Sequence, residues 1–241
     1  MTSPAERYAA SRRRAADEAN YPQLTGFVEG LAFDLDPFQR QACEALEDGG
    51  GVLVCAPTGA GKTVVGEFAV HLALRAGASG ARRKCFYTTP IKALSNQKFH
   101  DLIERYGAEQ VGLLTGDNSI NGDAPVVVMT TEVLRNMLYA GSSTLDGLGY
   151  VVMDEVHYLA DRFRGAVWEE VIIHLPASVT LVSLSATVSN AEEFADWLTT
   201  VRGETTVVVS EHRPVPLWQH MLVGKRMFDL FHDASAAAKH D

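Results

Sequence analysis

The stretch at residues 51–63 carries the residue types that bind phosphate groups. A short apolar run at 52–55 is followed by a loop of small residues and by a helix expected from Gly61 to about Ala76. Small residues let backbone N–H groups close round phosphate oxygens, and the helix N-terminus adds partial positive charge. In such a loop Lys62 contacts the β- and γ-phosphates, and the Thr63 hydroxyl contacts Mg²⁺. Four further loop residues are expected at the phosphates: Thr58, Gly59, Ala60 and Gly61.

Two carboxylates follow another apolar run, at 150–153. Carboxylates are poorly tolerated in a core, so Asp154 and Glu155 at the end of a buried strand belong in the crevice where α/β sheets bind ligands. Asp154 suits Mg²⁺, held directly or through water, and Glu155 suits the positioning or deprotonation of an attacking water. A role for Asp154 as a plain helix cap is the alternative.

Gln39 has two interpretations that its spacing leaves equally open. It stands three residues after Asp36, the expected cap of a helix that has Pro37 in its first position, and could close a capping box. Its amide could instead face adenine, accepting from N6 and donating to N7.

Three successive strands, expected at 84–88, 111–114 and 125–129, each end in threonine and lead into a turn or a helix. We expect Thr89 to cap one of these helices and Pro90 to occupy its first position. Carboxyl ends of parallel strands meet at one edge, so N–H groups and hydroxyls would form a row suited to a phosphodiester backbone. Lys92 and Lys98 are the cations expected there. The candidate contacts are Thr89, Pro90, Lys92, Asn96, Thr115, Gly116, Thr130 and Thr131.

The order of elements predicts an α/β fold. Further strands are expected at 179–184 and 204–210, with a helix at 191–199 between them. The 213–216 segment, with two prolines, then breaks regular structure.

Composition limits the class of protein. The chain has 241 residues, 46% of them hydrophobic, which suffices for one sizeable core. No apolar run reaches the ~18 residues of a membrane helix, and the N-terminus has no hydrophobic segment of the signal-peptide kind. The three cysteines show no paired spacing, which favours a reducing, cytoplasmic location. A net charge of −9 argues against a surface that wraps nucleic acid by bulk electrostatics.

Eight motifs together resemble the first RecA-like lobe of superfamily 2 DExH-box helicases, most closely the Ski-like, exosome-associated RNA helicases. The Ala- and Arg-rich N-terminus is similar to that of actinobacterial members. The motifs are DPFQ at 36–39, APTGAGKT at 56–63, TPIKALSNQK at 89–98, LTGD at 114–117, MTTEVLR at 129–135, DEVH at 154–157, SAT at 185–187 and RPVPL at 213–217.

The resemblance implies a RecA-like P-loop fold, a three-layer αβα sandwich with a mainly parallel central sheet. In this fold the strand ending at Ser185 would lie between the phosphate-loop strand and the Asp154 strand. Ser185 and Thr187 would then join the ATP site to the nucleic-acid face, with His157 as a further coupling residue. The resemblance also favours adenine recognition by Gln39 and suggests Phe33 as the ring that stacks on adenine.

The resemblance further implies that ATP, with Mg²⁺, is hydrolysed between this lobe and a second RecA-like lobe that supplies arginine fingers. We therefore expect three segments. Residues 1–31 would be a partly helical extension, 32–212 the RecA-like ATP-binding domain, and 213–241 a linker toward the second lobe. Such a fragment would hardly hydrolyse ATP alone.

The function implied by the resemblance is ATP-dependent unwinding of RNA in the 3′ to 5′ direction, on a single strand and without a membrane. Contacts from helix ends to phosphates leave the 2′-hydroxyl unread, so a DNA repair helicase of the same superfamily is an alternative. The other alternative, from a different class, is a nucleotide-gated interaction module that does not unwind.

Overall fold

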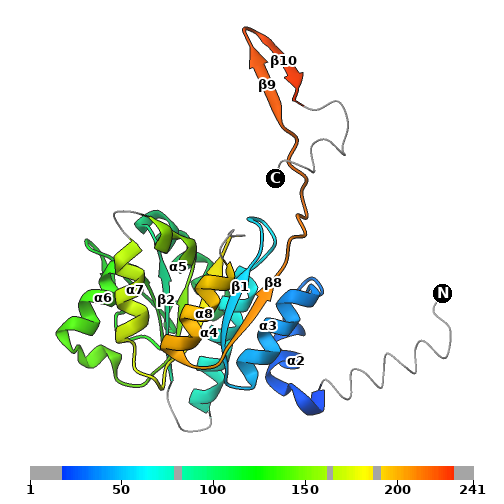
Figure 1. The fold of residues 1–241 in the computed structure, drawn as a ribbon. Helices are drawn as coiled ribbons and strands as arrows, with labels where there is room; N and C mark the ends of the chain where they lie inside the picture. The colour runs from blue at the N-terminus through cyan, green and yellow to red at the C-terminus, as the bar shows by residue number, and fades with distance from the viewer. Residues whose placement is uncertain (1–17, 79–82, 162–164, 187–190, 231–241) are drawn as a thin grey trace, which may run out of the picture.

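One large sheet with helices on both faces forms the body of the molecule (Figure 1). This computed structural model describes residues 18–78, 83–161, 165–186 and 191–230. The sheet has eight strands in the order β4-β3-β5-β2-β6-β7-β1-β8, and all neighbours pair in parallel except β4, which is antiparallel to β3. The strands are β1 (Gly51–Cys55), β2 (Lys84–Thr89), β3 (Val111–Leu114), β4 (Ser119–Ile120), β5 (Val126–Thr130), β6 (Leu148–Met153), β7 (Thr180–Ser185) and β8 (Thr205–Val209).

The helices lie in two layers, each sharing one hydrophobic cluster with the sheet. Helices α2 to α5 contribute Leu24, Leu46, Phe68 and Leu102, among others, to the first cluster. Helices α6 to α8 contribute residues such as Leu134, Trp168 and Leu198 to the second. The helices are α2 (Pro22–Val28), α3 (Pro37–Glu47), α4 (Thr63–Ala78), α5 (Lys92–Tyr106), α6 (Thr131–Ala140), α7 (Gly165–His174) and α8 (Ala191–Arg202).

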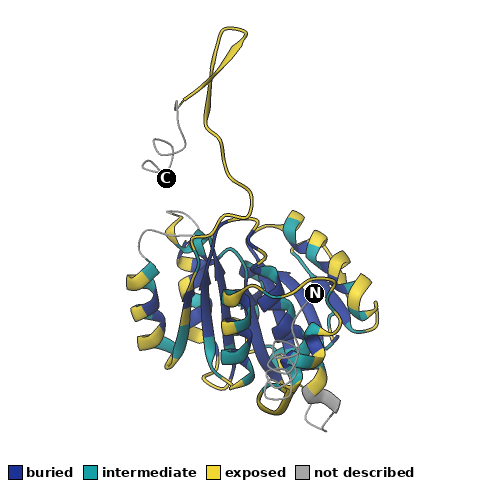
Figure 2. Ribbon diagram, turned by 90° about the vertical axis from the view of Figure 1, so that its right-hand side faces the viewer, coloured by how far each residue is buried: buried dark blue, intermediate teal, exposed yellow. Residues whose placement is uncertain are grey.

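Strand β1 shows why the central strands are continuous apolar runs. Val52 and Val54 belong to the cluster on the α2–α5 side, whereas Leu53 and Cys55 belong to the cluster on the opposite side. Successive side chains of a strand point to opposite faces, and here both faces are covered, so every position is apolar. Figure 2 shows the resulting layer of buried strands. The predicted three-layer α/β sandwich is thereby confirmed.

Helix α2 belongs to the body, although the sequence placed residues 1–31 in an extension. Leu24 and Phe27 are 1% and 2% exposed and join the first cluster. The carboxylate of Glu47 accepts hydrogen bonds from the N–H groups of Gln23 and Leu24, both at 2.8 Å, and so anchors the start of α2 on α3. The earlier part of the extension, residues 1–17, lies outside the described residues.

Other local expectations need correction. Helix α5 begins at Lys92 with Ile91 as its N-cap, so Thr89 and Pro90 precede the helix and do not open it. Thr130 is the N-cap of α6, but its hydroxyl makes no capping hydrogen bond. Helix α7 and the short strand β4 were not predicted, and the structure adds 3₁₀ turns at Ser143–Leu145 and Val156–Ala160.

After β8 the chain leaves the body and forms a hairpin of β9 (His220–Val223) and β10 (Arg226–Asp229), which projects from the body in Figure 1. Every residue from 211 to 230 is exposed, including apolar side chains such as Trp218, Leu222 and Phe228. The hairpin too was not predicted, because the sequence indicated a break in regular structure at 213–216. Within the described ranges, no helix has the length and apolar character needed to cross a membrane.

Candidate nucleotide and nucleic-acid site

The phosphate-loop strand and the acidic strand lie close together, separated by one strand. Strand β7 pairs with β1 on one side and with β6 on the other, so the ends of all three meet at one edge of the sheet. This confirms the strand order that the resemblance implies. Ser185, at the end of β7, is 1% exposed, and its carbonyl accepts from the N–H of Ala56, where the phosphate loop begins. Thr187 lies outside the described residues.

The phosphate loop depends on its glycines. Gly59 and Gly61 have φ values of 88° and 81°, in the left-handed region that favours glycine. A Cβ atom at Gly61 would also lie 2.7 Å from Nε2 of Gln39. The loop ends when the N–H of Val64 donates to the carbonyl of Gly61 at 3.2 Å and α4 begins at Thr63. The loop therefore has the small-residue conformation that brings backbone N–H groups close to a ligand.

Lys62 folds back onto its own loop. Its ammonium donates to the carbonyls of Ala56 at 2.7 Å and Pro57 at 3.1 Å, and the side chain is 8% exposed. Burial lowers the pKa of Lys62, while the charges of Glu155 and Asp154 oppose that shift. These carboxylates thus favour the ammonium form, which is the form that contacts phosphate.

Asp154 is held by both of its oxygens. Oδ1 accepts from the N–H of Glu155 at 2.9 Å, and Oδ2 accepts from the hydroxyl of Tyr87 at 3.0 Å. Burial raises the pKa of Asp154, and these two hydrogen bonds oppose the rise. Burial also raises the pKa of Tyr87, and the neighbouring Asp154 adds to it, so the phenol stays protonated and donates. The carboxylate therefore has a fixed orientation.

Glu155 occupies a strained position beside His157. Its φ and ψ are 54° and 44°, a left-handed conformation that costs a non-glycine residue free energy and is typical of functional sites. Its Oε2 lies 3.3 Å from Nδ1 of His157, and the N–H of Ala186 approaches the same nitrogen at 3.4 Å. A neutral imidazole nitrogen either donates or accepts, so Nδ1 serves one of these contacts at a time. His157 thus stands between Glu155 and the segment after β7.

Gln39 closes the capping box and also reaches the phosphate loop. Its Oε1 accepts from the N–H of Asp36 at 2.9 Å, and its Nε2 donates to the carbonyls of Ala60 at 3.3 Å and Gly61 at 3.0 Å. The capping-box interpretation is therefore correct for this conformation. Adenine recognition would require Nε2 to exchange the loop carbonyls for N7. Phe33, the expected stacking ring, is 53% exposed just before α3.

A pocket of about 380 Å³ lies beside the phosphate loop, and Phe38 and Gln41 of α3 are among its lining residues. It is formed by the start of α3, by Ala60, and by the segment that follows β8. Sequence reasoning missed Val209, the last residue of β8, and three residues of that segment, which are Ser210, His212 and Pro214. The signal available was the end of the predicted strand at 204–210, since parallel strands bring their ends to one edge.

Strands β3, β5 and β2, which lead into the threonines, are neighbours in the sheet and end at one edge, as the sequence predicted for the edge. Two of the threonine hydroxyls, however, point inward. Thr89 is 2% exposed, and its hydroxyl contacts the carbonyl of Ile91 at 3.1 Å and the Ser95 hydroxyl at 2.7 Å. Thr131 is fully buried, and its hydroxyl donates to the carbonyl of Thr89 at 3.4 Å. Thr130 and Pro90 are buried as well. The Thr131 hydroxyl thus joins the ends of β5 and β2, and the Thr89 hydroxyl joins the end of β2 to the start of α5. Neither hydroxyl faces solvent.

The exposed candidates on this edge are fewer than the sequence suggested. Asn96 and Gly116 are exposed and Thr115 is partly buried. The Lys92 side chain is 48% exposed and is paired with Asp117. Lys98, the other expected cation, is 12% exposed and lies 3.5 Å from Glu67 and 3.4 Å from Asp101, so its charge is already paired inside the protein.

The donor set fits a magnesium nucleotide. Mg²⁺ prefers oxygen ligands and is held by one or two carboxylates or hydroxyls together with substrate phosphates and water. Thr63 and Asp154 supply such oxygens at the same sheet edge as Lys62. Within the described residues no cluster of three or more histidine, cysteine or acidic side chains could hold a metal without a nucleotide.

The parallel sheet, the phosphate loop after β1 and the acidic pair after β6 define a RecA-like P-loop domain. The chain belongs to the DEAD/DEAH box helicase family, whose sequence pattern matches residues 36–194. The "Probable helicase HelY" of Mycobacterium tuberculosis (strain ATCC 25618 / H37Rv) is 75% identical over 209 residues, which cover 87% of this chain and 22% of that protein.

More distant relatives point to the Ski-like group. The "Antiviral helicase SKI2" of Saccharomyces cerevisiae is 47% identical over 204 residues, covering 84% of this chain and 16% of that protein. The "ATP-dependent RNA helicase mtr4" of Schizosaccharomyces pombe is 50% identical over 191 residues, with shares of 79% and 16%. The resemblance to Ski-like and actinobacterial helicases is thus confirmed. The chain spans 22% or less of the length of these relatives.

A solved structure shares the fold. The structure of the Mycobacterium smegmatis helicase Lhr bound to ssDNA and AMP-PNP superposes on this chain with a TM-score of 0.61 and 29% sequence identity. The match covers 78% of this chain and 27% of that one.

Proposed function

We propose that this chain is the ATP- and nucleic-acid-binding lobe of an ATP-dependent RNA helicase that moves 3′ to 5′. One observation carries the proposal. The phosphate loop with Lys62 and the Asp154–Glu155 pair follow strands on either side of β7, at the same edge as the exposed Asn96 and Gly116. A nucleotide and a single strand would therefore bind to neighbouring parts of one surface.

In the nucleotide half, Lys62 would exchange the carbonyls of Ala56 and Pro57 for phosphate oxygens, and the loop N–H groups from Thr58 to Gly61 would donate to the phosphates. Thr63 and Asp154 would hold Mg²⁺, which when bound neutralises charge on the β- and γ-phosphates. Glu155 would orient a water for attack on the γ-phosphoryl group and take its proton. Nδ1 of His157, 3.3 Å from Oε2 of Glu155, would orient the carboxylate for that step when this nitrogen carries a proton.

The adenine base would lie near the amide of Gln39 and the ring of Phe33. The pocket beside the phosphate loop, which Phe38, Val209 and Ser210 help to line, supports a site for base or ribose. Because the Gln39 amide is bonded to the loop at Ala60 and Gly61, its rotation toward a base would also release the loop for phosphate.

The single strand would cross the ends of β3, β5 and β2. Lys92, Asn96, Thr115 and Gly116 are the partly or fully exposed candidates. Thr130 and Thr131 would act through the first N–H groups of α6, since their side chains are buried, and Thr89 and Pro90 would support the edge from inside.

RNA is the first choice of strand because the similar protein mtr4 is named an RNA helicase. DNA is the second candidate, and a specific observation favours it, because the Lhr structure contains ssDNA. Fluorescence anisotropy of this chain with matched RNA and DNA single strands, with and without Mg²⁺–ATP, tests the choice. Tighter binding of DNA would select the second candidate. If neither RNA nor DNA binds, with or without Mg²⁺–ATP, the third candidate, an interaction module that does not unwind, is selected.

Two further assignments complete the proposal. A second RecA-like lobe is proposed as the partner of residues 213–241, supported by the exposed apolar side chains of the hairpin segment. A cytoplasmic location is proposed because Cys43, Cys55 and Cys85 are free and buried, as in a reduced core.

A further inference from the structure

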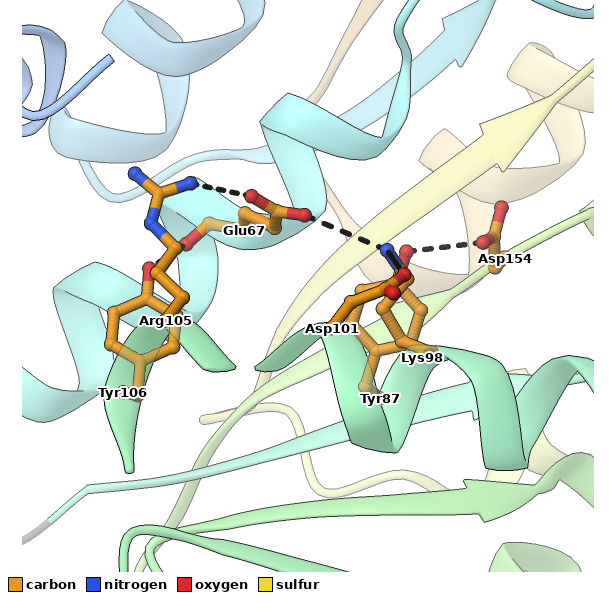
Figure 3. A network of polar contacts seen from close by, with 7 residues as sticks. All are labelled: Glu67, Tyr87, Lys98, Asp101, Arg105, Tyr106 and Asp154. Carbon is orange, nitrogen blue, oxygen red and sulfur yellow. Dashed lines mark hydrogen bonds and ion pairs between the residues drawn. The ribbon is translucent and has the colours of Figure 1, made fainter. Parts of the chain in front are cut away.

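A buried phenol connects the proposed metal ligand to a neighbouring strand. Tyr87 lies in β2, paired in register with Val152 of β6, and is fully buried. Its hydroxyl donates to Oδ2 of Asp154 at 3.0 Å. Figure 3 shows this contact at one end of a chain of polar contacts that runs across α5 and α4.

The two hydrogen bonds to Asp154 come from different parts of the fold. Oδ1 accepts from the N–H of the next residue, Glu155, so this bond is local to the chain just after β6. The N–H of Asp154 donates to the carbonyl of Thr88 at 3.0 Å, which fixes its backbone on β2. Oδ2 is bonded to Tyr87 on the same strand, so this contact ties the carboxylate itself to the sheet. Each oxygen can accept a second bond, which leaves a lone pair on both for a metal or its water.

Tyr87 is itself held from two sides. Helix α4 approaches it at Gly66, where an added Cβ would lie 3.0 Å from the ring. The ammonium of Lys98, on α5, lies 5.6 Å from the ring centroid, in the range of a cation–π contact. Lys98 is paired with Glu67, which is next to Gly66 on α4, and Glu67 is also paired with Arg105 of α5.

We propose that Tyr87 is a positioning residue that fixes the Asp154 carboxylate for Mg²⁺, and that Lys98 and Glu67 set the place of Tyr87 between α4 and α5. This inference rests on the proposed function, because it takes Asp154 as a metal ligand.

The arrangement joins the two halves of the site. Helix α4 begins at Thr63, in the nucleotide half, and α5 begins at Lys92, on the edge proposed for the single strand. The Lys98–Glu67 pair connects these helices over the Tyr87 ring. A displacement of α5 by a bound strand would therefore shift the ring that orients Asp154.

The test replaces the phenol with a ring of the same shape. In Tyr87→Phe, we expect the Mg²⁺ concentration for half-maximal binding of a fluorescent ATP analogue to rise about tenfold, because one hydrogen bond to a charged group is lost. Binding of the analogue without Mg²⁺ should be unchanged. The matched control is Tyr106→Phe, which removes a phenol bonded to the Glu67 carbonyl at 3.3 Å and leaves Asp154 untouched. Its Mg²⁺ requirement should equal that of wild type.

One further variant, Asp154→Asn, separates failure of the Tyr87 proposal from failure of the proposed function. If Asp154→Asn removes the Mg²⁺ effect and Tyr87→Phe behaves like Tyr106→Phe, the positioning role of Tyr87 is wrong and the proposed function stands. If Asp154→Asn itself leaves the Mg²⁺ requirement unchanged, Asp154 is no metal ligand and the proposed function fails with it.

Lys98→Met keeps the length of the side chain and removes its charge. We expect it to raise the Mg²⁺ requirement about threefold, and we expect the double variant with Tyr87→Phe to show no more than the Tyr87→Phe effect. Additive effects would contradict the role of Lys98. Should Tyr87→Phe fail to fold, judged by its melting temperature against that of Tyr106→Phe, the Lys98→Met titration decides: an unchanged Mg²⁺ requirement there overturns the proposal.

Discussion

The ends of β1, β7 and β6 differ from the ends of β3, β5 and β2, although all six lie along one edge of the same sheet. In the first group Lys62 and Gln39 are buried and Asp154 is partly buried. Each is bonded to nearby protein groups through atoms that would contact the nucleotide or its Mg²⁺. In the second group the Thr89 and Thr131 hydroxyls bond inward, and the exposed groups include Asn96, Gly116 and the paired Lys92.

This difference matches what each ligand requires. Recognition and cleavage of one nucleotide need charged groups held in one geometry, which burial and hydrogen bonds provide. Binding a strand of any sequence needs donors at regular intervals that read no base, which helix starts and turns provide. The nucleotide half should therefore be sensitive to single side-chain changes, whereas the strand half should be tolerant.

The largest expected effect concerns turnover. We expect residues 1–241 to bind Mg²⁺–ATP and hydrolyse it slowly, because the arginine that stabilises charge in phosphoryl transfer contributes about 10³–10⁵ in rate and would come from a second lobe. A longer protein that includes that lobe should recover this rate, measured as phosphate release. In the longer protein Glu155→Gln should abolish turnover and leave ATP binding intact, because the amide fills the same space and takes no proton.

Fast, Glu155-dependent hydrolysis by residues 1–241 in a monomer, checked by sedimentation, would contradict this expectation. The same result from a self-associated chain would point to an arginine from a neighbouring copy.

The next effect concerns the base. We expect a preference for ADP over GDP that corresponds to about 1–3 kcal/mol, because the Gln39 amide matches both N6 and N7 of adenine but only one of the two guanine acceptors. Calorimetry of Gln39→Ala should show the preference lost. Asp36→Ala alters the same helix start and leaves the amide in place, so it should keep the preference. A Gln39→Ala protein that still discriminates fully would restrict Gln39 to its capping-box and loop contacts.

A smaller effect tests the inward hydroxyls of the strand half. Thr89→Val keeps the side-chain shape and removes the contacts with Ile91 and Ser95. We expect the free energy of unfolding in urea to fall by about 1 kcal/mol, the net value of a buried hydrogen bond. Single-strand affinity should stay within about twofold of wild type. A large loss of strand binding at unchanged stability would mean that the hydroxyl reaches the strand.

The smallest expected effect tests how many cations of the strand half contact the single strand. Asp117→Asn releases Lys92 from its ion pair. We expect single-strand binding to tighten about two- to threefold at low salt, and its logarithmic salt slope to grow by about 0.7, the value for one more neutralised phosphate. Asp123→Asn, at an exposed aspartate without this pairing to Lys92, is the control and should change neither. A wild-type slope that requires many ion pairs would place the strand on another face.

Much of the fold follows from local patterns. The apolar run at 111–114 became β3 with the same bounds, and the run at 150–153 became the last four residues of β6, because strands covered on both faces stand out between polar turns. The order β6-β7-β1 came only from the family resemblance, since spacing along the chain does not determine which parallel strands are neighbours. Helix α7, which is apolar nearly all round, and the hairpin after 213–216 gave no periodic signal that was recognised.

The residues of the site could be predicted where the chemistry requires a particular residue type. They were harder to predict where the role of a residue depends on the direction of its side chain. Lys62, Thr63, Asp154 and Glu155 stand in a pattern that phosphate and magnesium binding require and that an ordinary turn does not. The direction of the Thr89 and Thr131 hydroxyls depends on side-chain rotation, which spacing does not reveal. Tyr87 looks like one more aromatic residue in a buried strand, and its contact with Asp154 spans 67 positions.

The most direct test of the account measures both ligands on two variants of this chain. Lys62→Ala should lower Mg²⁺–ATP affinity about tenfold or more, because a charged contact with phosphate is lost, and leave single-strand affinity within about twofold. Replacement of both Lys92 and Asn96 by alanine should weaken the single strand about three- to tenfold and leave Mg²⁺–ATP affinity unchanged. If both variants lost affinity for Mg²⁺–ATP and for the single strand to the same extent, with unchanged melting temperatures, the claim that the two ligands bind to separate halves of one sheet edge would be contradicted.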